Sequence, residues 1–192
     1  MINPYKVVKE IGFERLAGSE GEEKAIKILS KYIKDLGFKP KLESFDLTSF
    51  DAGSAIIKVE GKEFKGLPYG LNENATITGE LAVLENMDII DHNKGAYEGK
   101  IVMCYGFSRG MAPKLKAAGV AGYIGIGSPH RDATSLSHRQ RSHKDGYVHS
   151  ITITHDNAIK LRKFDGKLIA IDIKQKVEKR KAQNIVVDIL GK

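Results

Sequence analysis

The 192-residue sequence has 31 Lys and Arg against 24 Asp and Glu, a net charge of +7, and 41% hydrophobic residues, enough for a core. Its single cysteine, Cys104, excludes an intramolecular disulfide and a cysteine-based zinc cluster. The sequence has neither a run of about 18 apolar residues nor an amino-terminal signal core, so we expect a soluble, cytoplasmic protein with no membrane contact.

The first 50 residues predict two helices and a strand. A short helix is expected over residues 5–14. The segment Ser19–Gly37 predicts an amphipathic helix, because Ser19 and Glu22 can form a capping box and apolar residues then recur at helical spacing. Gly37 is a natural stop for this helix. A strand is expected over residues 41–47.

From Asp51 onward the sequence predicts a region rich in strands. Short apolar runs between glycines and polar turns indicate strands at 54–59, 63–67, 76–85 and 100–105. No helical pattern of useful length separates them, which favours antiparallel or mixed sheet over repeated βαβ units. The fold class predicted from the sequence is therefore α+β or mixed; the resemblance described below implies that the β-rich domain stands on a small base of helices and two strands.

The rest of the chain predicts strands alternating with short helices. Helices are expected at 111–119 and 156–164, and strands at 120–126, 150–154 and 168–177, with a polar stretch from 127 to 149. The charged residues 178–181 then precede a final strand at 184–190. The apolar run Ile185–Leu190 is typical of a strand covered on both faces. The resemblance described below implies that this strand pairs antiparallel with the strand at 41–47.

Several short segments resemble the M28 zinc aminopeptidase family. The segment Arg15-Leu16-Ala17-Gly18-Ser19, with the helix and strand after it, is similar to the opening of these enzymes, and Asn184–Gly191 is similar to the strand that returns to pair with the first. The region between them resembles the PA (protease-associated) domain inserted there in many members. The segments Gly99–Val102, Gly106–Gly110 and Ala117–Gly122 carry that likeness.

The resemblance implies a domain layout and a function. Residues 1–47 would be the amino-terminal base, 48–181 the PA-like domain and 182–192 the returning strand of the base. In the family the zinc ligands begin with a His-x-Asp motif that follows this strand, where the sequence ends. The resemblance therefore implies no catalytic residue and no metal in this chain, with zinc expected only for a full M28 peptidase. It implies a non-catalytic protein-interaction or substrate-access module.

Two other functions stay open at this point. The chain can be part of a zinc aminopeptidase whose catalytic half is missing or lies in another chain. Alternatively, Gly106–Gly110 matches the Gly-x-Ser-x-Gly elbow of serine hydrolases, with Ser108 as nucleophile and His149 or His155 as its base. The serine hydrolase core needs crossover helices that residues 51–100 do not predict.

A segment rich in histidine and arginine supplies the candidate ligand-binding residues. Five of the six histidines lie between residues 130 and 155. Four histidines can hold zinc, but the paired spacing of a structural zinc site is missing. Guanidinium groups bind carboxylates in bidentate fashion, so an anion or acidic partner is a second interpretation, and a solvated loop is the third. The candidates are Arg131, His138, Arg139, Arg141 and His143.

A smaller cluster contains Asp88, Asp91 and His92. Carboxylates and an imidazole this close in sequence can bind a metal or exchange protons. The composition Asp-His-Asn before Lys-Gly is also ordinary turn chemistry, which is the favoured interpretation.

The expected partner is a protein or a peptide. Without a peptidase domain, the apolar face of the 19–37 helix and the final strand would lack cover, which promotes association. We expect a homo-oligomer or a catalytic partner chain. Nucleic acid is not expected, because the lysines are dispersed and no basic patch alternates with aromatic residues. The predicted interface consists of Ile26, Leu29, Ile33, Leu36, Ile185 and Val187.

Overall fold

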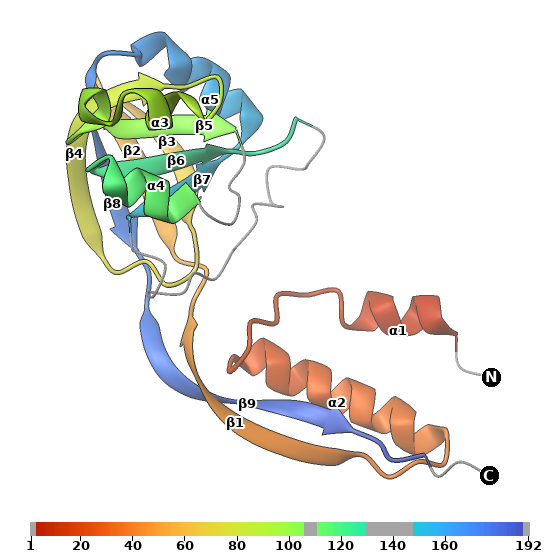
Figure 1. The fold of residues 1–192 in the computed structure, drawn as a ribbon. Helices are drawn as coiled ribbons and strands as arrows, with labels where there is room; N and C mark the ends of the chain where they lie inside the picture. The colour runs from red at the N-terminus through yellow and green to blue at the C-terminus, as the bar shows by residue number, and fades with distance from the viewer. Residues whose placement is uncertain (1–2, 106–110, 130–147, 190–192) are drawn as a thin grey trace. The chain divides into compact units, whose positions relative to one another are not determined.

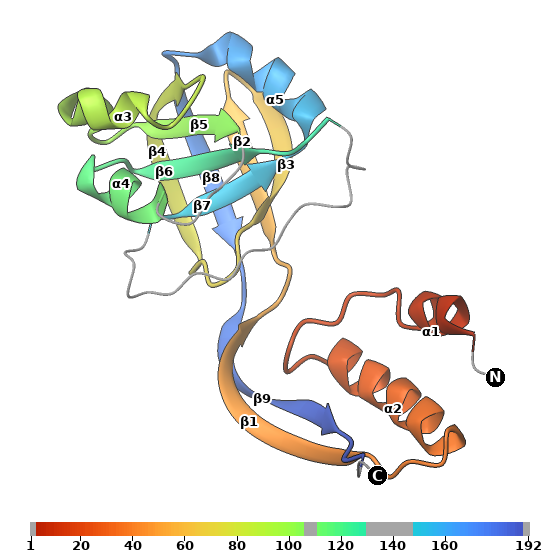
Figure 2. The same cartoon turned by 45° about the vertical axis from the view of Figure 1, so that its right-hand side comes forward.

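The computed structural model describes residues 3–105, 111–129 and 148–189. These residues form two compact units, and the chain passes from the first to the second and back. We call residues 3–51 with 177–189 the ribbon unit, and residues 52–176 the barrel unit. Helices and strands occur in both, which confirms the predicted α+β class (Figures 1 and 2).

The ribbon unit contains α1 (Pro4–Glu10), α2 (Glu20–Asp35), β1 (Lys41–Phe50) and β9 (Val177–Val186). The predicted Ser19 cap of α2 is confirmed, while Glu22 reaches back to Gly18, one residue beyond the Ser19 N–H that a capping box would use. The hydroxyl of Ser19 accepts a hydrogen bond from the Glu22 N–H at 3.3 Å, and the Glu22 carboxylate accepts one from the Gly18 N–H at 2.8 Å. Both bonds satisfy backbone groups at the start of the helix, so they fix the residue at which α2 begins.

Arg15 and Gly18, from the segment that resembles the opening of M28 aminopeptidases, stabilise the turn before α2. The guanidinium of Arg15 donates to the carbonyl oxygens of Ile11 at 2.7 Å and Phe13 at 3.2 Å. Gly18 has a φ of +76°, and a Cβ there would lie 2.6 Å from the Cβ of Arg180. The turn therefore requires glycine both for its backbone conformation and for this close approach.

Strands β1 and β9 pair antiparallel along their whole length, from Lys41 opposite Val186 to Phe50 opposite Val177. The predicted pairing is confirmed, but the predicted extent of the last strand is wrong. The charged residues 178–181 lie inside β9, and Ile189, beyond its end, is 72% exposed. A two-stranded ribbon leaves much of its surface open to water, so charged side chains fit within it.

Helix α2 packs against β9 and supplies the small core of the ribbon unit. Ala25 and Ile26 of the helix are buried, as is Ala182 of the strand. Leu36, at the end of the same apolar stripe, is 56% exposed. The helix therefore buries the beginning of its apolar face and leaves the end of it open.

The strands of the barrel unit close into a barrel in the order β2-β3-β7-β6-β5-β4-β8. Strands β4 to β7 run parallel in the order β4-β5-β6-β7, and the other pairings are antiparallel, as predicted for a mixed sheet. Their bounds are Ser54–Val59 (β2), Lys62–Pro68 (β3), Ala75–Val83 (β4), Ile101–Tyr105 (β5), Gly122–Ile126 (β6), Ser150–Ile153 (β7) and Leu168–Lys174 (β8).

Two apolar clusters fill the barrel unit. One occupies the interior of the barrel and includes Leu161 and Phe164, which come from α5 (His155–Leu161) and η3 (Arg162–Phe164). These two helices cover one end of the barrel (Figure 2). The other cluster lies between the outer face of β5 and β6 and the helices α3 (Ile89–His92) and α4 (Met111–Ala117), next to η1 (Lys94–Tyr97). Cys104 is buried there, and burial raises the pKa of its thiol, as expected for a structural cysteine.

A buried amide also ties the barrel together. The Asn72 side chain accepts a hydrogen bond from the Ser150 N–H at 2.9 Å and donates to the Ser150 carbonyl at 2.9 Å. The backbone N–H of Asn72 donates to the side-chain oxygen of Gln175 at 2.7 Å.

Among the described residues, no helix combines the length and apolar character needed to cross a membrane.

Candidate functional site

The barrel unit has a cavity of about 210 Å³ at the carboxyl ends of its parallel strands. Val83, Tyr105 and Ile126, which end β4, β5 and β6, line it together with Ala158 and Ile159 of α5. Parallel strands expose their carboxyl ends at one edge, and loops or helices that follow them build binding sites there. The lining is mostly apolar, which suits an apolar ligand group.

Side-chain hydrogen bonds fix the helical wall of this cavity. Thr154 accepts from the Asn157 N–H at 3.2 Å and starts α5, while the Asn157 side chain donates to the Lys65 carbonyl of β3 at 3.0 Å. At the other side, the Asp165 carboxylate accepts from the Val83 N–H of β4 at 2.9 Å. Helices α5 and η3 are thereby anchored to the strands on both sides of the cavity.

Tyr105 is a polar residue of the lining, and His155, which does not line the cavity, contacts it from outside. The Tyr105 hydroxyl lies 3.1 Å from Nε2 of His155, and the two ring centroids are 6.1 Å apart. Tyr105 is 56% exposed although it ends a buried strand. The hydrogen bond holds the phenol ring at the cavity, because a tyrosine hydroxyl retains a polar partner while its ring packs on apolar groups.

Opposite charges stand at the cavity's margin. Glu85 follows β4 and Arg162 begins η3, and both are exposed. Within the part of the chain that the structure describes, neither side chain makes an ion pair. The margin can therefore bind one cationic and one anionic group of a ligand.

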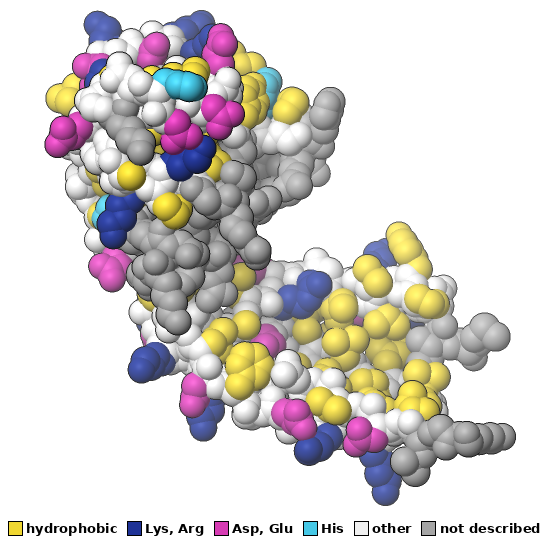
Figure 3. Space-filling model, in the orientation of Figure 1, with side chains coloured by type: hydrophobic (Ala, Val, Ile, Leu, Met, Phe, Trp, Pro, Cys, Tyr) yellow, Lys and Arg dark blue, Asp and Glu magenta, His cyan; other side chains and the backbone are white. Residues whose placement is uncertain are grey.

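Exposed apolar side chains gather on the ribbon unit. Figure 3 shows hydrophobic side chains on its surface, and Leu36, Phe38, Leu42 and Phe45 are between 38% and 56% exposed. A more open recess of about 450 Å³ lies between α2 and the start of β1, lined by apolar Ile26 and Leu42 and by lysines of the helix. Exposed apolar side chains and an open apolar recess on one small unit mark it as a candidate protein-binding region.

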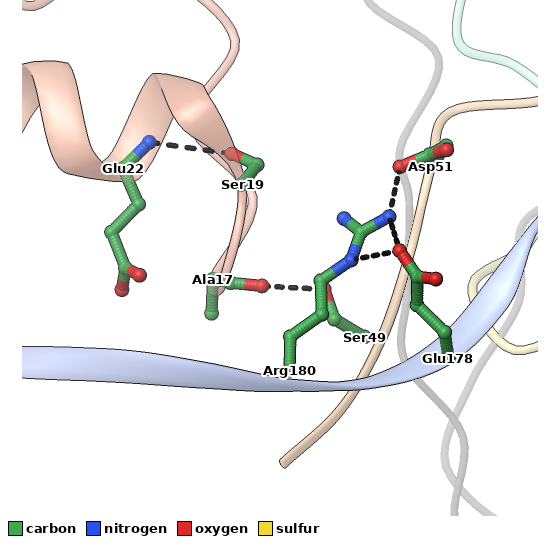
Figure 4. A network of polar contacts seen from close by, with 7 residues as sticks. All are labelled: Ala17, Ser19, Glu22, Ser49, Asp51, Glu178 and Arg180. Atoms are coloured by element: carbon green, nitrogen blue, oxygen red, sulfur yellow. Dashed lines mark hydrogen bonds and ion pairs between the residues drawn. The ribbon is translucent and has the colours of Figure 1, made fainter. Parts of the chain in front are cut away.

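A polar network holds the ribbon unit together (Figure 4). The Arg180 guanidinium contacts Glu178 at 2.7 Å and Asp51 at 2.6 Å, and these carboxylates raise its pKa. The hydroxyl of Ser49 donates to the Ala17 carbonyl, which links β1 to the turn before α2. Every group here has a structural partner, so the network stabilises the unit and supplies no reactive group.

The structure pairs the Asp88 and Asp91 carboxylates with Lys114 of α4. The Lys114 ammonium lies 3.5 Å from Asp88 and is hydrogen-bonded to Asp91, and Asp91 most strongly raises its pKa. This pairing agrees with a structural interpretation of the cluster.

Among the residues described, no three His, Cys, Asp or Glu side chains come together in a way that could hold a metal ion, so we assign none of them to zinc.

The predicted site residues fall into two groups. Ser108 lies outside the described residues, as do all five residues of the predicted ligand-binding segment, Arg131, His138, Arg139, Arg141 and His143. The predicted interface residues lie in the ribbon unit. Ile26 is buried against the rest of that unit, and Leu36 is exposed. The other four, Leu29, Ile33, Ile185 and Val187, are partly buried.

Sequence reasoning missed the cavity at the strand ends. The sequence suggests His155 only as a partner of Ser108 and as one of the clustered histidines, and it suggests no role for Tyr105, Glu85 or Arg162. A signal was present, because Tyr105 ends an apolar strand with a polar aromatic residue and Glu85 follows the preceding strand. The parallel pairing of β4 and β5, which the sequence did not reveal, brings these residues together.

Comparison with known proteins gives structural matches only. No protein-family model matches the sequence, and no curated protein matches it. An aminopeptidase from Aneurinibacillus sp. strain AM-1 matches with 18% identity and a TM-score of 0.58, covering 95% of this chain and 46% of that one. BSAP, a zinc aminopeptidase from Bacillus subtilis, matches with 16% identity and a TM-score of 0.64, covering 95% and 45%.

A peptidase M28 precursor from Shewanella amazonensis SB2B matches with 14% identity and a TM-score of 0.63, covering 94% of this chain and 48% of that one. The chain thus spans about half the length of these solved structures. Nearly all of it shares its fold with part of zinc aminopeptidase and M28 peptidase structures. At these identities the likeness is one of fold.

Proposed function

We propose that this chain is a non-catalytic protein-interaction or substrate-access module related to M28 aminopeptidases. The observations that carry the proposal are the exposed apolar residues of the ribbon unit, Leu36, Phe38, Leu42 and Phe45, and the edge of β1 that is unpaired among the described residues. The fold shared with M28 peptidase structures supports the relationship.

The free edge of β1 is the more suitable place for a protein partner. Among the described residues, β1 pairs with β9 alone, so its outer N–H and C=O groups can bond to another strand. Leu42 and Phe45 on β1 are 45% and 42% exposed. Strand β9 carries exposed Lys179 and Lys181, and lysines discourage edge-to-edge pairing.

We propose a second copy of this chain as the partner. Antiparallel pairing of two β1 edges about a twofold axis would bring the same apolar residues of both copies together, as a self-complementary interface requires. Sedimentation velocity tests this proposal over a range of protein concentrations. The expected result is a dimer at high micromolar concentration, abolished by Phe45→Lys. The control is Leu168→Lys, which charges a 69% exposed leucine of the barrel unit and should leave the dimer intact.

A monomer at every concentration would contradict the second-copy proposal. The favoured alternative is then a separate chain that carries the catalytic half of a zinc aminopeptidase. That alternative predicts that the chain binds such a polypeptide through β1, and that Phe45→Lys weakens the binding.

Enzyme assays test the non-catalytic part of the proposal directly. Purified chain with added zinc should not release the amino acid from an aminoacyl p-nitroanilide. Zinc-dependent release by this chain alone would overturn the proposal. The serine hydrolase alternative predicts that a fluorophosphonate probe labels Ser108 stoichiometrically, whereas a non-catalytic module leaves Ser108 unlabelled.

A further inference from the structure

We propose that the cavity at the carboxyl ends of β4, β5 and β6 binds a free apolar amino acid. The proposal concerns the barrel unit alone and does not depend on what the ribbon unit binds. Three features of the cavity together identify this ligand: its size, its apolar lining and the opposite charges at its margin.

The size of the cavity sets the scale of the ligand. Sites for drug-sized molecules have volumes of roughly 300–1,000 Å³. The cavity has about 210 Å³, which suits a ligand on the scale of one amino acid. Its wall is anchored to β3 and β4 through Asn157 and Asp165, so little ordering is needed when a ligand binds.

The lining selects an apolar side chain. Val83, Met103, Ile126 and Ala158 present apolar groups to the cavity, and Ile159, 54% exposed, extends them to the surface. Burying a leucine or phenylalanine side chain against such a surface is favourable because it removes apolar area from water. A glycine or a charged amino acid gains no such contact.

The charges at the margin select a zwitterion. The Arg162 guanidinium can donate two parallel hydrogen bonds to the α-carboxylate, and the Glu85 carboxylate can accept from the α-ammonium group. A ligand with a single charge satisfies only one of them. The Tyr105 hydroxyl, positioned by His155, offers an additional hydrogen bond at the apolar wall.

NMR spectroscopy of the full chain with labelled isoleucine δ1-methyl groups tests the proposal. Titration with L-leucine or L-phenylalanine should shift the signals of Ile126 and Ile159 in a saturable way. The signals of Ile57, inside the barrel, and Ile185, in the ribbon unit, should stay unchanged. The absence of saturable shifts at millimolar ligand, or shifts confined to other methyl groups, would overturn the proposal.

Variants and ligand analogues test the two charges separately. Arg162→Gln and Glu85→Gln should each weaken leucine binding roughly tenfold, the size of one lost charge-assisted hydrogen bond. The matched controls Lys163→Gln and Glu63→Gln remove exposed charges that do not line the cavity, and should bind leucine normally. Equal binding by the margin variants and by the controls would contradict the assigned roles.

The analogues distinguish a free amino acid from a peptide end. Leucinamide lacks the carboxylate and N-acetyl-leucine lacks the ammonium group, so both should bind at least several-fold more weakly than leucine. If N-acetyl-leucine binds as tightly as leucine, the ammonium group is not recognised, and a peptide carboxyl terminus replaces the free amino acid as ligand. That outcome would overturn the proposal as stated.

Discussion

Arg180 of β9 places its guanidinium 2.6 Å from the carboxylate of Asp51, the residue that follows β1. The Arg180 side chain is 15% exposed and also contacts Glu178, while its Cβ packs on the turn at Gly18. One residue thus links the paired strands of the ribbon and the turn that starts α2. The charged segment that the sequence suggested as a connection between strands instead contains this central link.

Replacing Arg180 should loosen the ribbon unit. A well-formed hydrogen bond to a charged group contributes about 1.5–3 kcal/mol to stability. Because Asp51 is exposed, its contribution is smaller, and we expect Arg180→Ala to lower the free energy of unfolding by about 1–2 kcal/mol. Urea denaturation gives the free energy of unfolding, and hydrogen exchange over α2 and β1 locates the change. Lys179→Ala, an exposed neighbour, is the control. Equal losses in both variants would show that the Arg180 contacts add nothing.

Removal of the Ser19 hydroxyl should destabilise α2. Ser19→Ala leaves the Glu22 N–H without its acceptor, at a cost of about 1 kcal/mol. Ser19→Asp keeps an acceptor at the same position and should retain the stability of the native chain. Thermal unfolding followed by far-ultraviolet circular dichroism compares the two variants. If Ser19→Asp loses as much as Ser19→Ala, the loss has a cause other than the cap.

Leu161 should be among the most costly positions in the barrel unit. It is fully buried where α5 covers the barrel, so Leu161→Ala leaves a cavity and is expected to cost about 2–5 kcal/mol. The matched control, Leu168→Ala, changes a leucine that is 69% exposed and should alter the free energy of unfolding by less than about 0.5 kcal/mol. Urea denaturation measures both. Similar values for the two would mean that α5 does not seal the barrel core.

His149 should make stability depend on pH near neutrality. Burial lowers its pKa below the ordinary value of 6.5, although the charge of Glu73 acts in the opposite direction. Between the lowered folded pKa and the unfolded pKa, the unfolded chain binds more protons than the folded chain. The contribution of His149 to stability is therefore fully present above about pH 6.5 and is lost as the pH falls toward the lowered pKa.

The variant His149→Gln isolates this effect. It cannot take up a proton, and it keeps the backbone carbonyl that accepts from the Tyr123 N–H. Thermal unfolding between pH 5 and pH 8 should show a smaller loss of stability on acidification than in the native chain. The hydrogen bonds to Lys58 and Thr76 lower the pKa of Asp172, so its protonation changes stability only below about pH 4. It does not contribute to the pH dependence between pH 5 and pH 8. Identical pH profiles for the native chain and the variant would show that His149 does not cause the loss of stability on acidification.

Most strands and helices could be predicted because their signals are local. The Ser19 cap of α2, and the apolar runs of β2 and β5, are read from neighbouring residues alone. The last strand was misplaced because its position depends on a distant partner. Pairing with β1 extends β9 across the charged residues 178–181, and an exposed ribbon tolerates charges that a covered strand would not.

The candidate site could not be predicted in the same way. Glu85, Tyr105 and Arg162 are far apart in the sequence, and no spacing rule connects them. They meet because β4 and β5 pair in parallel and because η3 is anchored to β4 through Asp165. Side-chain direction at a strand end depends on this register, which the sequence pattern does not specify.

By itself, the sequence determined the fold class, the start of α2 and the strand character of runs such as those of β2 and β5. Each of these depends on short-range pattern or composition. Only the tertiary structure decided the closure of the barrel, the extent of β9 and the meeting of Glu85, Tyr105 and Arg162 at one cavity. These features depend on which strands pair and in which direction. Such long-range choices are set by the packing of the whole core, so a local pattern leaves them open.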